Sequence, residues 1–147
     1  MHRFPRRTVL SGLATAVALT ALPLLGRAQS AQPPKHKALI QVSDNDAQKW
    51  NLALNNARNM QDDLNADAID LEIVVYGPGI DMLKADSPVA KRVGDALKAG
   101  VQVVACENTM RNQKLVRGDM LAGIGYVDAG MVEIMKKQQQ GWAYIRP

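Results

Sequence analysis

The residue with the clearest chemical potential in this 147-residue sequence is Cys106, because it is the only cysteine. A single cysteine cannot close a disulfide within its own chain, so its thiol is a candidate nucleophile. It follows the apolar run at residues 101–105, where we expect a buried strand to end and a helix to follow. Free cysteines are also often inert core residues, and this alternative stays open for Cys106.

Reactivity of this thiol requires that its thiolate form be favoured. The start of a helix favours a nearby anion by about 0.3–1 kcal/mol, whereas one pKa unit corresponds to about 1.4 kcal/mol. A helix start alone therefore lowers the thiol pKa by less than one unit, and the carboxylate of Glu107 opposes even that. We therefore expect a solvent-reachable sulfur beside a cation, with Arg111 and Arg117 as the nearest candidates in sequence. Ordinary solvated surface positions are the alternative for both arginines.

Further candidate site residues surround the sequence Y-G-P-G. Tyr76, Gly77 and Gly79 belong to this loop, which lacks the Lys-Ser/Thr of a phosphate loop and the spacing of a dinucleotide-binding motif. Its backbone N–H groups can approach a small anion, or the loop is a plain tight turn. Asn108 or Thr109 is expected to cap the helix that follows the cysteine, at the same edge of the domain.

The sequence lacks the residues that several other kinds of chemistry require. His2 lies in the N-terminal leader and His36 precedes the first expected strand at the opposite edge, so a Cys–His hydrolase has no general base. One histidine and one cysteine at opposite edges give no metal cluster, and we expect neither a metal nor another cofactor. Beyond the first 28 residues the chain has 14 basic and 14 acidic side chains, so we expect no nucleic-acid partner.

The elements that must position these residues alternate between strands and helices. Apolar periodicity predicts a helix at residues 47–64 and another at 129–140, and Ser87 and Pro88 begin a third helix that Gly100 ends. A short helical turn is expected near residues 80–83. This order predicts an α/β fold with a mainly parallel sheet, helices on both faces and a site at the strand ends. Five short apolar runs predict strands at residues 38–42, 69–76, 101–105, 124–127 and 142–145.

Residues 1–31 have the pattern of a signal peptide, with a basic start, an apolar stretch at 12–25 and small residues at the end. The apolar stretch is too short to span a bilayer comfortably, since a spanning helix needs about 20 apolar residues. The run R-R-T-V-L-S at residues 6–11 resembles a twin-arginine export signal, and an ordinary secretory signal or a retained anchor is the alternative. We expect an exported, periplasmic protein without a membrane span in its mature part.

Three segments together resemble the DsrE/DsrF-like family of sulfur-relay proteins. The most specific is A-G-V-Q-V-V-A-C-E-N-T-M at residues 99–110; the others are residues 75–83 and the ending Q-Q-Q-G-W-A-Y-I-R-P. The resemblance covers residues 37–147 and implies a three-layer α/β/α domain that forms homotrimers or hexamers. It also implies that Cys106 carries sulfane sulfur as a persulfide. The export signal departs from the family's relay proteins, which work in the cytoplasm.

Two functions follow from these observations. The first is a sulfur carrier or sulfurtransferase, whose partners are a sulfane-sulfur donor and an acceptor thiol, each a small molecule or a protein. The second is a non-catalytic periplasmic module that binds a small anion or a partner protein, with the cysteine merely packed. The expected site consists of catalytic Cys106 with supporting Tyr76, Gly77, Gly79, Asn108, Thr109 and Arg111.

Overall fold

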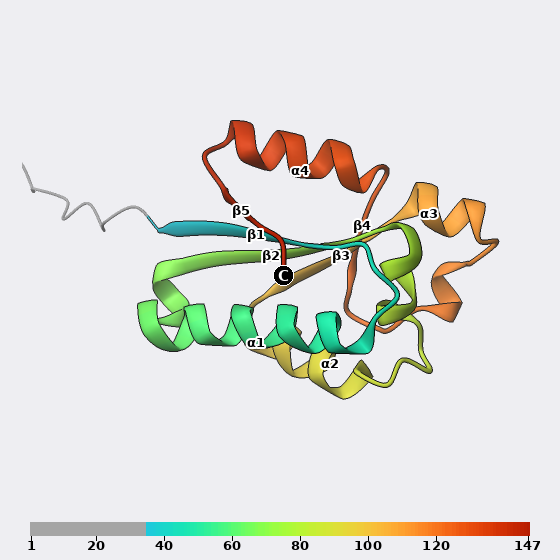
Figure 1. The fold of residues 1–147 in the computed structure, drawn as a ribbon, viewed down its shortest axis with the longest axis horizontal. Helices are drawn as coiled ribbons and strands as arrows, with labels where there is room; N and C mark the ends of the chain where they lie inside the picture. Colours follow the sequence, from blue (N-terminus) through green and yellow to red (C-terminus); the bar gives the residue numbers. More distant parts are fainter. Residues whose placement is uncertain (1–34) are drawn as a thin grey trace, which may run out of the picture. The chain divides into compact units, whose positions relative to one another are not determined.

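The computed structural model describes residues 35–147, and the expected signal peptide lies outside this part of the chain. The described residues form a five-stranded sheet in the order β4-β3-β2-β1-β5, and every pair of neighbours is parallel (Figure 1). The predicted α/β class and parallel sheet are therefore confirmed. The strands are β1 (His36–Val42), β2 (Ile69–Val75), β3 (Gln102–Cys106), β4 (Gly125–Val127) and β5 (Ala143–Ile145).

Helices cover both faces of this sheet, which gives the expected three layers. Helices α1 (Ala47–Leu64) and α2 (Ala90–Lys98) lie on one face, and α4 (Gly130–Gln139) lies on the other (Figure 1). Helix α3 (Glu107–Asn112) follows β3 directly. Three short 3-10 helices complete the connections: η1 (Ala66–Ala68), η2 (Gly77–Leu83) and η3 (Arg117–Asp119).

The first helix shows how local sequence specifies an element. Asp46 is its N-cap, and its carboxylate accepts hydrogen bonds from the N–H groups of Gln48 (2.8 Å) and Lys49 (3.4 Å). Such a cap satisfies donors that the first turn of a helix leaves unpaired. The buried side chains of Trp50 and Leu54 lie on the face that packs on the sheet. The predicted bounds of this helix are confirmed.

The predicted start of the helix that Gly100 ends was wrong by a few residues. Helix α2 begins at Ala90 rather than at Ser87 and Pro88, because Ser87 closes a separate turn before it. The Ser87 hydroxyl accepts from the N–H of Val89 (3.3 Å), and its carbonyl accepts from that of Ala90 (3.0 Å). Gly100, at φ +85°, ends this helical segment as expected.

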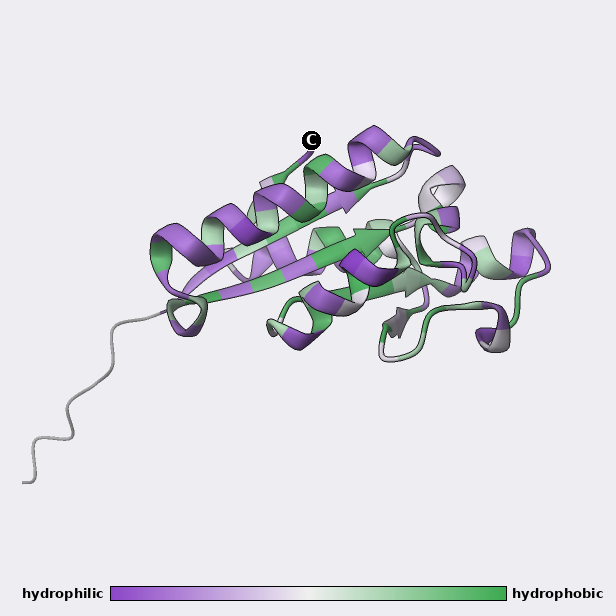
Figure 2. Cartoon of the chain, turned by 90° about the horizontal axis from the view of Figure 1, so that it is seen from below, coloured by the Kyte–Doolittle hydropathy of each residue, from purple (hydrophilic) through white to green (hydrophobic). Residues whose placement is uncertain are grey.

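The two faces of the sheet are packed very differently. The face under α1 and α2 contributes to a core of 22 buried apolar residues, whereas the second core, under α4, has four. In Figure 2 the helices carry hydrophobic and hydrophilic residues side by side, as surface helices do. The four residues under α4 are Leu39, Val74, Val104 and Ile134.

Candidate functional site

The single thiol lies at the carboxyl edge of the sheet, as expected. Cys106 is the last residue of β3 and the N-cap of α3, with extended backbone angles (φ −77°, ψ 112°). Val75 pairs with Ala105 on the neighbouring strand, so the next residues, Tyr76 and Cys106, follow side by side. Val127 of β4 pairs with Cys106 on the other side. By alternation along β3, the cysteine side chain shares the α4 face with that of Val104.

The predicted cap of the helix after the cysteine was wrong. Helix α3 begins at Glu107, and neither Asn108 nor Thr109 caps it with a side chain. The N–H of Asn108 instead donates to the carbonyl of Asp128 (3.0 Å), and the Thr109 hydroxyl accepts from the N–H of Gly77 (2.9 Å). The carbonyl of Asp128, which is distant in sequence, therefore accepts from an N–H of the first helical turn, as a local cap would have done.

The thiol is less accessible than the sequence predicted, because Cys106 is only 4% exposed. It nevertheless belongs to neither of the two apolar clusters. Its Sγ lies 3.9 Å from the carbonyl oxygen of Asp128, which accepts the S–H. Tyr76 and Glu107 beside it are half-buried, and Asn108 is exposed. The sulfur is thus buried, with polar groups near it at the edge of the sheet.

Hydrogen bonds favour the ionised form of this buried sulfur. Burial raises the pKa of Cys106, but hydrogen bonds from the Thr109 hydroxyl and from the backbone N–H groups of Gly130 and Thr109 more than offset this effect, together with the Asn108 N–H that Cys106 shares with the Asp128 carbonyl. The pKa of the thiol therefore lies below its ordinary value. These backbone donors belong to the first turns of α3 and α4, where N–H groups have no partner within the helix.

The Gly-Pro-Gly loop positions Thr109 for this role. The N–H of Gly77, a residue at φ +55°, donates to Thr109 Oγ1, so the hydroxyl hydrogen is left to point at the sulfur. The N–H of Gly79 donates to the carbonyl of Ser43 (3.0 Å), and a Cβ on Gly79 would lie 2.9 Å from the carbonyl oxygen of Val42. Both glycine N–H groups are thus engaged within the chain. The loop fits the role of a spacer better than that of an anion cradle.

The expected cation beside the sulfur is replaced by these neutral donors. The guanidinium of Arg111 donates to the side-chain oxygen of Asn108. Arg117 pairs with the carboxylate of Glu107 (2.5 Å) and lies over the ring of Tyr126, 4.3 Å from its centroid. Arg117 therefore offsets the charge of Glu107, the group that sequence reasoning expected to oppose ionisation of the thiol.

Sequence analysis missed three residues of this site. Gly130 begins α4 beneath Tyr76, and a Cβ there would lie 3.1–3.3 Å from atoms of the Tyr76 side chain. Gln41 Nε2 donates to the Tyr76 hydroxyl (2.5 Å), and the hydroxyl of Tyr144 donates to Gln41 Oε1. Burial raises the pKa of Tyr76, so this phenol stays protonated at neutral pH. The polar Gln41 within an apolar run was a usable signal, whereas nothing in the sequence marked Gly130.

The described residues offer neither a metal-binding cluster nor a membrane-spanning helix. Within residues 35–147, no three His, Cys, Asp or Glu side chains gather where they could hold a metal ion. None of the helices in that part of the chain is long and apolar enough to cross a membrane.

A parallel α/β/α domain with one thiol at its carboxyl edge defines the class of protein. The DsrE/DsrF-like family model matches residues 36–147, and the chain belongs to that family. A solved structure, the protein of unknown function MTH1491 from Methanobacterium thermoautotrophicum, is 32% identical with a TM-score of 0.74. The match covers 77% of this chain and 100% of that protein.

Two more distant structures share the fold alone. BT1422 from Bacteroides thetaiotaomicron, a conserved protein of unknown function, is 16% identical with a TM-score of 0.59, over 76% of this chain and 94% of its own. The ychN protein from E. coli is 11% identical with a TM-score of 0.62, over 78% of this chain and 99% of its own. No curated protein matches the chain significantly.

Proposed function

We propose that this protein carries sulfane sulfur as a persulfide on Cys106 and passes it to an acceptor thiol. The observation that carries the proposal is the chain's single thiol at the sheet edge, where hydrogen bonds from two helix starts and from Thr109 lower the pKa of that thiol. The thiolate, and not the thiol, is the nucleophile in sulfur transfer. Membership of a family related to sulfur-relay proteins supports the same function.

The proposed transfer is balanced without an external oxidant. The Cys106 thiolate attacks the outer sulfur of a donor persulfide, the donor's S–S bond breaks, and the donor thiolate leaves. In the second step an acceptor thiolate attacks the outer sulfur on Cys106, and the Cys106 thiolate leaves. The same hydrogen bonds that stabilise the thiolate before attack also stabilise it as the leaving group.

The position of the sulfur restricts the donor. A side chain that is 4% exposed admits only a slender group, or requires Tyr76 or the Asp128 loop to move. A persulfide would add one S–S bond of about 2 Å, which carries the outer sulfur toward the surface. The acceptor can then attack without entering the protein. Burial of the inner sulfur also directs an attacking thiol to the outer sulfur.

The direct test is to expose the purified protein to inorganic polysulfide and to measure its mass. We expect Cys106 to gain the mass of one sulfur atom, and a thiol such as glutathione to remove it. Cys106→Ser should gain nothing. A thiol that alkylates readily but never acquires sulfur would contradict the proposal.

The role of Thr109 can be separated from its packing. Thr109→Val keeps the shape of the side chain but removes the hydroxyl, and a hydrogen bond to a charged group contributes about 1.5–3 kcal/mol. We therefore expect the thiol pKa to rise and alkylation by iodoacetamide at neutral pH to slow by roughly tenfold. Thr109→Ser retains the hydroxyl and should alkylate at nearly the original rate. Equal slowing in both variants would assign Thr109 a packing role only.

The alternative function, a binding module with an inert cysteine, is favoured by one observation, the 4% exposure of Cys106. It predicts that Cys106→Ser leaves ligand binding and oligomer size unchanged. It also predicts slow alkylation in the folded state with no dependence on Thr109. Measured alkylation rates therefore decide between the two functions.

Assembly and export complete the proposal. We infer a homotrimer or hexamer, and the apolar side chains that α4 leaves exposed support this: Met131 (59%), Met135 (50%) and Val132 (42%). Light scattering should give the oligomer mass, and Met135→Glu should lower it if α4 lies in the interface. The expected twin-arginine signal and periplasmic location would be tested by N-terminal sequencing of protein from cell fractions. A full-length cytoplasmic product would contradict export.

A further inference from the structure

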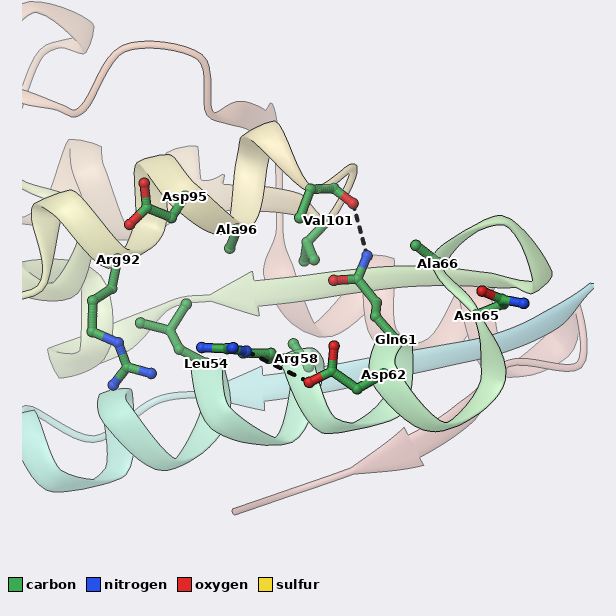
Figure 3. A pocket seen from close by; sticks show the side chains of 12 residues that line it. Leu54, Arg58, Gln61, Asp62, Asn65, Ala66, Arg92, Asp95, Ala96 and Val101 are labelled. Carbon is green, nitrogen blue, oxygen red and sulfur yellow. Dashed lines mark hydrogen bonds and ion pairs between the residues drawn. The ribbon is translucent and has the colours of Figure 1, made fainter.

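A cavity of about 590 Å³ lies between α1 and α2, and Figure 3 shows side chains that line it. These two helices lie on the face of the sheet opposite α4 (Figure 1). Its volume falls in the range of about 300–1,000 Å³ that small-molecule sites occupy. Leu54, Ala57 and Val101, among its lining residues, are almost fully buried, with 3%, 1% and 3% exposure. Ala57 of α1 and Ala96 of α2 have small side chains, so the two helices leave space between them. The floor of the cavity is therefore apolar.

The acidic groups that line the cavity already have partners. Asp62 pairs with Arg58 (3.5 Å), as Figure 3 shows, and Asp95 pairs with Lys91 (2.8 Å). The positive charge of Arg58 is likewise matched by Asp62. These pairs leave no uncompensated negative charge beside the cavity.

Arg92, by contrast, has no acidic partner among the described residues. Its guanidinium donates to the side-chain oxygens of Asn51 and Asn55 on α1, which are neutral. These two amides orient the guanidinium without neutralising it, and three of its five N–H donors remain unused among the described residues. A half-buried, oriented guanidinium beside a cavity with an apolar floor is suited to bind a carboxylate.

We propose that this cavity binds a small organic monoanion, whose carboxylate pairs with Arg92 and whose apolar part lies on Leu54, Ala57 and Val101. The site is independent of the thiol, because Cys106 projects from the α4 face at the carboxyl edge. Neither the carrier function nor its alternative assigns any role to this cavity.

The test uses hexanoate as the probe and hexan-1-ol as its neutral match. We expect hexanoate to shift the amide NMR signals of Ala96 and Val101 and to bind at least tenfold more tightly than hexan-1-ol. Arg92→Gln should weaken hexanoate binding roughly tenfold. Lys98→Gln removes the same charge from an exposed position on α2 and should leave the affinity unchanged.

A second variant tests the cavity without altering Arg92. Ala96→Leu places a larger side chain in the space between the helices and should abolish hexanoate binding while the protein stays folded. Cys106→Ser should bind hexanoate like the original chain, which separates this site from the thiol. The proposal is overturned if hexan-1-ol binds as tightly as hexanoate, or if Ala96→Leu leaves the hexanoate affinity unchanged.

Discussion

The two faces of the sheet have opposite characters. The face under α1 and α2 belongs to a continuous core of 22 buried apolar residues. The face under α4 has a core of four, and the other buried side chains on it include Gln41, Glu72 and Cys106. Burial of polar groups costs free energy unless they find partners. The first face therefore provides the stability that allows the second to carry polar groups and a thiol.

Elements above the second face supply those partners. The ammonium group of Lys137, on α4, donates to the carboxylate of Glu72 (2.5 Å). Lys137 also lies over the ring of Trp142, 4.2 Å from its centroid. Burial raises the pKa of Glu72, and Lys137 only partly opposes the effect. One oxygen, Glu72 Oε1, has no hydrogen-bond partner among the described residues. The buried carboxylate of Glu72 thus depends on the docking of α4.

The largest change in the free energy of unfolding should come from a substitution on the face under α1 and α2. Ile73 is fully buried under α1 and α2, so Ile73→Ala leaves a cavity and should lower the free energy of unfolding by about 4 kcal/mol. The pKa of the Cys106 thiol should stay the same, because the side chain of Ile73 points away from α4. Denaturant unfolding and the pH dependence of alkylation measure the two properties. A shifted thiol pKa would show that the faces are not independent.

The next largest change should come from the ion pair under α4. Lys137→Met removes the partner of a buried carboxylate and should cost about 3 kcal/mol. The double variant Glu72→Gln with Lys137→Met leaves no buried charge and should recover much of the loss. Urea unfolding of the single and double variants tests this. No recovery in the double variant would mean that Lys137 acts through its contact with Trp142.

A smaller loss of stability is expected from a substitution where α4 meets the thiol. Gly130→Ala brings a Cβ to 3.1 Å from Tyr76 and should cost about 2 kcal/mol by overpacking. The displaced N–H of residue 130 then weakens its bond to Cys106, and the thiol pKa should rise. The matched change Gly94→Ala, at a position with open space, should leave the thiol pKa unaltered. An unchanged thiol pKa in Gly130→Ala would remove α4 from the site.

The smallest effect should be the pH dependence that Glu72 introduces. Its pKa in the folded state lies above the ordinary value of 4.5, so its contribution to stability is complete below pH 4.5 and is lost as the pH rises through the folded pKa. Acidification from pH 7 toward 4.5 should therefore stabilise the original chain relative to Glu72→Gln. Thermal unfolding across this window measures the slope. Parallel profiles for the two proteins would contradict the raised pKa.

Local patterns predicted the elements well but their ends less well. The helix at 47–64 was predicted to the residue because its cap, Asp46, is adjacent in sequence. The start of α3 was predicted wrongly because the bonds to Asn108 and Thr109 come from Asp128 and Gly77, in other loops. The carboxyl-edge position of the cysteine was predictable, since it needs only the strand order of an α/β fold.

By itself the sequence determined the family, the parallel α/β fold and the position of Cys106 at the end of a strand. Only the tertiary structure decided how deeply the sulfur is buried and which groups lower its pKa. The physical reason is that apolar periodicity is a local property, whereas the donors around the sulfur come from helices that begin at residues 107 and 130 and meet only after folding.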